Sequence, residues 1–195
     1  LLDGCALLAS LNRHPHILVA SDWAGSGVKR TLLAFACRLA RWPTVIRPDS
    51  PMAAAFTRAE RTGSLRTALN DSIDILADGG LLVVFPEGYP TIDPHRSSGL
   101  EADQNLPFDS GFMTIARVAA RRLGVDVPIV PVGFAYQQLA NGKWSVAMRI
   151  GTPISRRHGV NASEFALDVQ KRVVALSAPV PAYVETESTS ASETI

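Results

Sequence analysis

Residues 81–90, LLVVFPEGYP, join an apolar run to a polar loop. The run LLVVF is typical of a short buried strand, and Pro86 stops the strand because it has no amide hydrogen to donate. Glu87 and Gly88 follow at the carboxyl end of the strand, and a glycine there allows a ligand to approach the backbone closely. These residues alone favour a ligand site and a plain strand exit with a solvated glutamate about equally.

Predicted helices and strands alternate on both sides of this stretch, which favours an α/β fold with a mixed, largely parallel sheet flanked by helices. Ligands in such folds gather at the carboxyl ends of strands, so the loops after Ser21, Arg47 and Phe85 are the ones to inspect. The patterns predict strands at 16–21, 44–47, 81–85, 127–136 and 143–151. They predict helices at 3–12, 28–42, 51–78, 111–123 and 162–177. The helix at 51–78 would be capped by Ser50 and is either continuous or broken near Gly63.

The size and charge of the chain limit the kinds of protein that it can be. Its 195 residues suit one domain with a real core. We expect that domain to span 1–177, and residues 178–195, rich in Pro, Ser, Thr and Glu, to form a disordered tail. A net charge of +1 argues against nucleic-acid binding. No run approaches the roughly 18 apolar residues that span a bilayer, so we expect any membrane contact to come from the surface or from an upstream anchor.

Cysteines and other reactive side chains give little sign of a separate site. Cys5 and Cys37 lie in apolar runs, so we predict reduced core residues rather than a disulfide framework. A thiol enzyme is disfavoured because neither cysteine has a neighbouring histidine motif. No His, Cys and carboxylate set has metal-ligand spacing, so no metal is expected. Arg117 and Arg121 share one helix face at i and i+4, which favours a solvated face over the alternative of contact with anionic head groups.

Several blocks, taken in order, resemble one family. They are FPEG (85–88), LPFDSGF (106–112), VPIVPVGF (127–134) and RIGTPI (149–154). Their order and spacing resemble the phospholipid/glycerol acyltransferases, of which 1-acylglycerol-3-phosphate acyltransferase is a familiar member. The resemblance covers roughly residues 1–155. It implies transfer of a fatty acyl group from acyl-CoA or acyl-carrier protein to the hydroxyl of a lysophospholipid or glycerol phosphate-like acceptor, with no cofactor beyond the donor substrate.

The same resemblance implies roles for individual residues. It places Arg47, at the end of TVIR, against an acceptor phosphate, an anion that a planar guanidinium suits well. A surface ion pair is the alternative for Arg47. The implied floor of the acceptor pocket is formed by Phe85, Pro86, Glu87 and Gly88, and Gly111 matches the glycine of the family's Phe-x-x-Gly.

The family's catalytic motif is a histidine followed five residues later by an aspartate. The imidazole takes the proton of the attacking hydroxyl, and the carboxylate orients the imidazole. None of the four histidines of this chain is followed by such an aspartate. Asp3 stands where the family's acid belongs, and the matching histidine would fall five residues earlier, upstream of Leu1. We therefore expect an N-terminal truncation and an inactive fragment.

The chain also departs from the family. Tyr89 and Pro90 follow FPEG where the family has Thr-Arg, an arginine expected to help hold the acceptor phosphate. This difference motivates the alternative of a non-catalytic relative that binds lipids or acyl chains. Arg96, in the long loop after FPEG, is either a replacement for that cation or a solvated loop arginine. The expected partners are a lipid acceptor, an acyl donor such as acyl-carrier protein, and a membrane surface, at the cytoplasmic face of a membrane.

Overall fold

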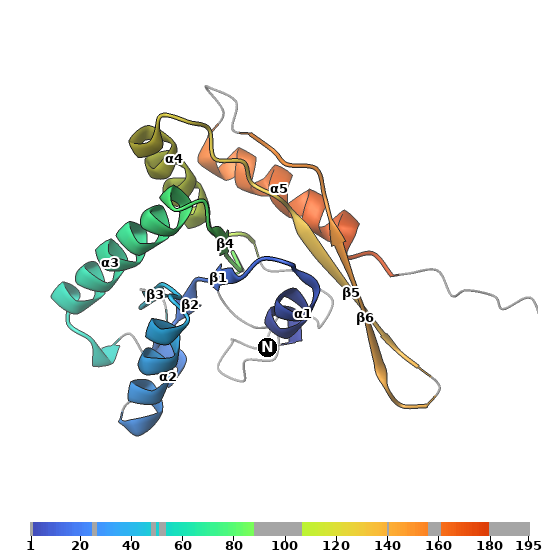
Figure 1. The fold of residues 1–195 in the computed structure, drawn as a ribbon, viewed down its shortest axis with the longest axis horizontal. Coiled ribbons are helices and arrows are strands. Elements are labelled where there is room, and N and C mark those ends of the chain that lie inside the picture. Colours follow the sequence, from blue (N-terminus) through green and yellow to red (C-terminus); the bar gives the residue numbers. More distant parts are fainter. Residues whose placement is uncertain are drawn as a thin grey trace, which may run out of the picture.

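The computed structural model describes residues 2–24, 27–47, 50, 54–87, 107–139, 141–155 and 161–179 (Figure 1). Helices alternate with short strands, so the predicted mixed α/β class is confirmed. The elements are α1 (Leu2–Ser10), β1 (Pro15–Ile17), β2 (Val19–Ala20), the 3₁₀ turn η1 (Asp22–Ala24), α2 (Val28–Leu39), β3 (Thr44–Val45), α3 (Arg58–Ala77), β4 (Leu81–Val83), α4 (Gly111–Leu123), β5 (Val132–Gln138), β6 (Trp144–Ile150) and α5 (Ala162–Leu176).

Two small, two-stranded parallel sheets lie next to each other in the N-terminal half. β1 pairs with β4 and β2 pairs with β3, both in parallel. β1 and β2 follow each other with one residue between them, and that residue, Leu18, donates its amide to the Val83 carbonyl at 2.9 Å. Val19 donates its amide to the Pro43 carbonyl at 2.9 Å on the other side. The segment of β1 and β2 therefore lies between β4 and β3.

The predicted start of the third helix is wrong. We expected it at residue 51, but α3 begins at Arg58. A capping box decides the start: the Thr57 side chain accepts a hydrogen bond from the Glu60 amide, and the Glu60 carboxylate accepts one from the Thr57 amide. The helix then continues through Gly63 without a break.

Helices α4 and α5, with the segments that flank them, enclose an apolar cluster. Its buried members are Met113, Phe165 and Val169. β5 and β6 form an antiparallel hairpin, and α5 runs alongside β5 (Figure 1). The contact is close because a side-chain carbon added at Gly133 would lie 2.5 Å from the Leu176 backbone.

Two burial predictions need correction. Cys37 is buried as expected, but Cys5 is exposed because α1 directs only Leu7, among its described side chains, fully into the core. β4 is half-buried rather than buried, since within the described residues it pairs with β1 alone. Among the helices in the described ranges, none is long and apolar enough to cross a bilayer.

Candidate functional site at the carboxyl edge of the parallel sheet

The parallel pairing brings the exits of separate strands to one edge of the sheet. Asp22 follows β2, Arg47 follows β3 by one residue, and the segment 85–87 follows β4. The first turn of α1 lies at the same edge, because a side-chain carbon added at Gly4 would be 3.8 Å from Cδ1 of Ile17, the last residue of β1. Asp3 is in that turn. The sheet thus gathers residues from distant parts of the sequence, at the edge where α/β folds bind ligands.

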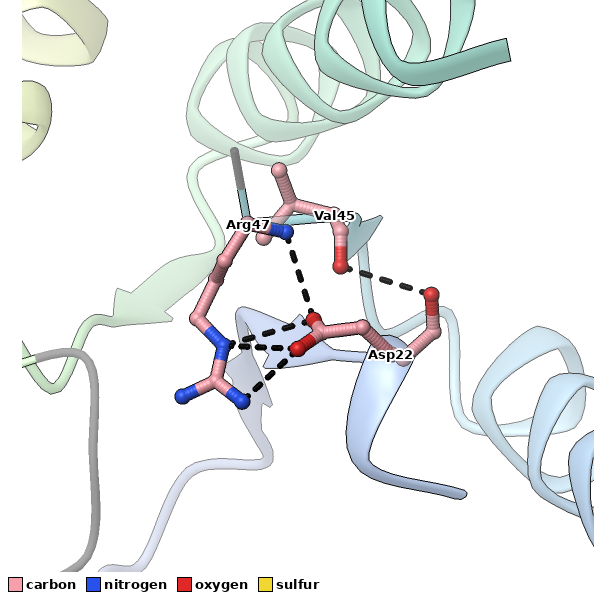
Figure 2. Close-up of polar contacts among 4 residues, drawn as sticks. Asp22, Val45 and Arg47 are labelled. Carbon is pink, nitrogen blue, oxygen red and sulfur yellow. Dashed lines mark hydrogen bonds and ion pairs between the residues drawn. The ribbon is translucent and has the colours of Figure 1, made fainter. Parts of the chain in front are cut away.

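Arg47 and Asp22 form the best-defined polar contact at this edge (Figure 2). The Asp22 Oδ2 atom accepts hydrogen bonds from Arg47 Nη2 at 2.7 Å and from Arg47 Nε at 3.0 Å. The Arg47 backbone amide also donates to Asp22 Oδ1, at 3.2 Å. The carboxylate therefore fixes both the backbone and the guanidinium of Arg47, while Nη1 points away from Asp22 in Figure 2.

This ion pair is buried. The Asp22 side chain is fully buried, and that of Arg47 is 14% exposed. Burial favours the neutral carboxyl group, but hydrogen bonds from Arg47 and Ser50, together with the Arg47 charge, outweigh it and lower the pKa of Asp22 below its usual value. Asp22 is thus held as a carboxylate, and Arg47 is oriented rather than mobile.

The strand exit after β4 is fastened to the start of α4. The Pro86 carbonyl accepts a hydrogen bond from the Asp109 amide at 2.8 Å. Phe85 is exposed, whereas Pro86 and Glu87 are half-buried. Gly88 and Arg96, the other residues predicted in this region, lie outside the described residues, as do Tyr89 and Pro90.

Gly111 is the first residue of α4, and its backbone amide donates to the Asp109 carboxylate. A side-chain carbon at Gly111 would lie 2.9 Å from Asp109 Oδ1. The absence of a side chain at Gly111 therefore makes room for the Asp109 carboxylate. The backbone amide of Asp109 in turn donates to the Pro86 carbonyl at the strand exit. Gly111 is thus linked through Asp109 to Pro86, one of the residues predicted to form the pocket floor.

Asp3 has a hydrogen-bond partner from the C-terminal half of the chain. The Tyr136 hydroxyl, on β5, donates to Asp3 Oδ1. Asp3 is half-buried, and this burial raises the pKa of its carboxyl group. The carboxylate at the start of α1 is thus held at the sheet edge by a phenol.

The described histidines lie away from this edge. His14 precedes β1 and donates through Nε2 to the Ala40 carbonyl at 3.4 Å, and His16 donates through Nδ1 to the Arg41 carbonyl at 3.1 Å. Both imidazoles bind backbone carbonyls just after the end of α2, near the amino ends of the strands. These contacts indicate a structural role for the two histidines. His95 and His158 fall outside the described ranges. In the described part of the chain, no group of three His, Cys, Asp or Glu residues could hold a metal ion.

Sequence reasoning missed Asp22. The signal was present, because Asp22 directly follows the predicted strand 16–21 and that loop was among those to inspect. What the sequence did not show was that β2 and β3 are neighbours. Only this pairing places a carboxylate after one strand against a guanidinium after the next.

Comparison with known proteins found one family whose model matches this chain. The model of the Acyltransferase family, the glycerolipid acyltransferases, matches residues 5–135, about two thirds of the chain. The chain belongs to the Acyltransferase family. Membership points to acyl transfer in lipid synthesis, with a lipid and an acyl donor as substrates. Asp22, Arg47 and Glu87 lie within the matched residues, and Asp3 lies just before them. No curated protein and no solved structure was found to match.

Proposed function

We propose that this acyltransferase moves a fatty acyl group from acyl-CoA or acyl-carrier protein to the hydroxyl of a lysophospholipid or glycerol phosphate-like acceptor. The observation that supports it most directly is the orientation of Arg47 by a buried carboxylate at the carboxyl edge of a parallel sheet. A guanidinium held in one orientation can form paired hydrogen bonds to phosphate oxygens without first losing rotational freedom.

The proposed reaction is a direct attack. The acceptor oxygen bonds to the thioester carbonyl carbon, its proton passes to a base, the carbon–sulfur bond breaks, and the thiol leaves with a proton. By the family motif, the base is a histidine five residues before Asp3, and Asp3 orients it. Tyr136 contributes by holding Oδ1 of Asp3. We place the reaction at the cytoplasmic face of a membrane, with the protein bound peripherally or anchored by an upstream segment.

Acyl transfer is tested with purified protein extended upstream by about ten residues, in which the proposal requires a histidine five residues before Asp3. Labelled acyl-CoA and acyl-carrier protein are offered with glycerol 3-phosphate, lysophosphatidate and monoacylglycerol, and the products are separated by chromatography. We expect transfer by the extended protein and none by residues 1–195 alone. Absence of transfer from both donors would support the lipid-binding alternative instead, and strong transfer by residues 1–195 would contradict the assignment of the base.

The role of Arg47 is tested by Arg47→Lys, which keeps a cation beside Asp22 and removes the planar fork. We expect KM for the phosphate-bearing acceptors to rise about tenfold, as the loss of one charge-assisted hydrogen bond predicts. KM for monoacylglycerol should not change. Arg122→Lys is the control, since Arg122 pairs with Asp74 on the surface, with both side chains more than half exposed. An equal rise for all acceptors would mean that Arg47 supports the fold rather than the phosphate.

A further inference from the structure

Helix α2 carries an apolar stripe that the fold leaves uncovered. Its members are Val28, Leu32, Phe35 and Leu39, whose exposed fractions lie between 62% and 79%. Single exposed apolar residues are ordinary, but these four, at i, i+4, i+7 and i+11, lie together along one side of the helix, and a contiguous apolar surface marks an interaction site. At about 100° per residue, they project within an arc of roughly 60°. We call these four residues the α2 stripe.

The α2 stripe faces away from the rest of the protein. Cys37 projects roughly opposite to it on a helical wheel, and Cys37 is the buried residue of α2. In Figure 1, α2 lies at the lower margin of the molecule, beside β2 and β3. The helix is therefore anchored by one side and presents an apolar side to the surroundings.

The charges of α2 indicate what covers this stripe. α2 contains Lys29, Arg30 and Arg38 and no acidic residue. Arg30 is used within the fold, where its guanidinium lies 4.4 Å from the Phe56 ring centroid. Lys29 and Arg38 flank the stripe on opposite sides of the wheel, and both are exposed. Neither forms an ion pair with any described residue.

An apolar stripe bordered on both sides by cations is the pattern of a helix that lies in the interface of an anionic bilayer, with its apolar side among the acyl chains and its cations at the headgroup phosphates. A second protein chain would need acidic groups around an apolar groove. Two copies of α2 packed through this stripe would bring like charges together, because α2 has cations and no acidic residue.

We propose that α2 docks the protein on an anionic lipid surface through the α2 stripe, with Lys29 and Arg38 at the headgroups. The inference deepens the proposed function, because α2 starts a few residues after Asp22 and so begins at the edge of the sheet that holds the candidate site. Docking would bring that edge close to the bilayer, where an amphiphilic acceptor resides.

The test is binding of the 195-residue chain to vesicles, measured by flotation with no acyl donor or acceptor added. We expect binding to vesicles of phosphatidylcholine with about 30% phosphatidylglycerol, and weaker binding as salt is raised. Leu32→Gln/Phe35→Gln should lower the partition coefficient at least about tenfold, because two large apolar side chains lose their burial. The matched control is Leu65→Gln/Leu167→Gln, which changes exposed leucines on α3 and α5 and should alter binding less than about twofold.

The charge requirement is tested separately. Lys29→Gln/Arg38→Gln should weaken binding to the anionic vesicles about 25-fold at low salt, at roughly fivefold for each cation near the surface. Arg117→Gln/Arg121→Gln removes the same charge from α4 and should have little effect. Phe35→Trp keeps an apolar ring, and its added fluorescence should be quenched by brominated acyl chains.

Several results would overturn the proposal. These are absence of vesicle binding, equal losses for the α2 variants and their controls, and no quenching of the added fluorescence of Phe35→Trp by brominated lipid. A concentration-dependent dimer in sedimentation velocity that Leu32→Gln/Phe35→Gln dissociates would show that a second copy is the occupant. Because vesicle binding is measured without substrates, a failed transfer assay with intact vesicle binding would remove the proposed function alone.

Discussion

At the scale of single residues, the candidate site depends on one buried ion pair. Asp22 makes no contact with solvent, and its hydrogen bonds to Arg47 determine how that guanidinium is presented. Removing one partner of a buried pair leaves the other charge uncompensated, whereas exposed pairs contribute little to stability. Asp22 is therefore a positioning residue, because it acts through Arg47.

We expect Asp22→Asn to lower the free energy of unfolding by about 2–3 kcal/mol, because it leaves a largely buried guanidinium without its counter-charge. The matched control is Asp78→Asn. Asp78 pairs with Arg41 at 3.0 Å, but both side chains are 63% exposed. This control should cost less than about 0.5 kcal/mol. Urea denaturation measures both, and equal losses would mean that burial of the Asp22 pair has no energetic consequence.

The pH dependence of this stabilisation has a defined sign. Because the pKa of Asp22 is lowered in the folded protein, its contribution is complete above the ordinary pKa of aspartate and is lost as pH falls through the lowered value. The difference in unfolding free energy between wild type and Asp22→Asn should thus be constant from about pH 7 to about 5 and shrink below about 4. A difference that grows towards low pH would show that the pKa is raised instead.

At the scale of elements, a glycine can be required where two backbones pack too closely for a side chain. Gly133 lies on β5 against the end of α5, and an added side-chain carbon would come within 2.5 Å of backbone and side-chain atoms of Leu176. Gly63, inside α3, has no atom within 4 Å of the same position. Close packing therefore requires a glycine at residue 133, whereas the space around residue 63 would accept a side chain.

We expect Gly133→Ala to destabilise the protein by about 2 kcal/mol, because α5 must shift to accommodate a methyl group. Gly63→Ala should stabilise it by about 0.5–1 kcal/mol, since alanine is the better helix former and nothing obstructs it. Thermal and urea unfolding of both variants provide the comparison. A loss of stability in Gly63→Ala would mean that α3 does not continue through residue 63 in solution.

The elements also show how far the sequence alone could predict this fold. The bounds of the fourth helix, 111–123, were predicted correctly because a glycine at each end limits the periodic pattern. The start of α3 was missed because Pro51 and Ser50 imitate a helix start, while the capping box from Thr57 to Glu60 is the actual one. Residues such as Glu87 and Gly111 could be nominated from motifs. The Asp22–Arg47 pair and the Tyr136–Asp3 contact could not, because both depend on which elements become neighbours.

At the scale of the whole molecule, the two halves of the chain are joined at the site. The Asp109 amide reaches the Pro86 carbonyl, and the Tyr136 hydroxyl reaches Asp3. Away from the site, Arg122 on α4 pairs with Asp74 on α3 at 3.1 Å. The C-terminal half thus supports residues that belong to the N-terminal half.

We expect Tyr136→Phe to lower the free energy of unfolding by about 1 kcal/mol, the usual contribution of one hydrogen bond. The pKa of Asp3, already raised by burial, should rise further because the carboxylate loses a donor. Carbon-13 NMR titration of the aspartates reports the second effect. A double-mutant cycle with Asp3→Asn should give a coupling energy, and additive effects would show that the contact is not formed in solution.

The position of the segment of β1 and β2 between two partners has a consequence for the order of assembly. Closing the chain between Asp22 and Arg47 spans 25 residues, whereas the Arg13–Gly79 contact beside the β1–β4 pair spans 66. The entropy lost in closing the longer loop is greater by about 0.9 kcal/mol. The segment from Asp22 to Arg47 therefore has the shorter loop to close, and we expect β2 and β3 to pair before β4, which precedes Glu87, pairs with β1.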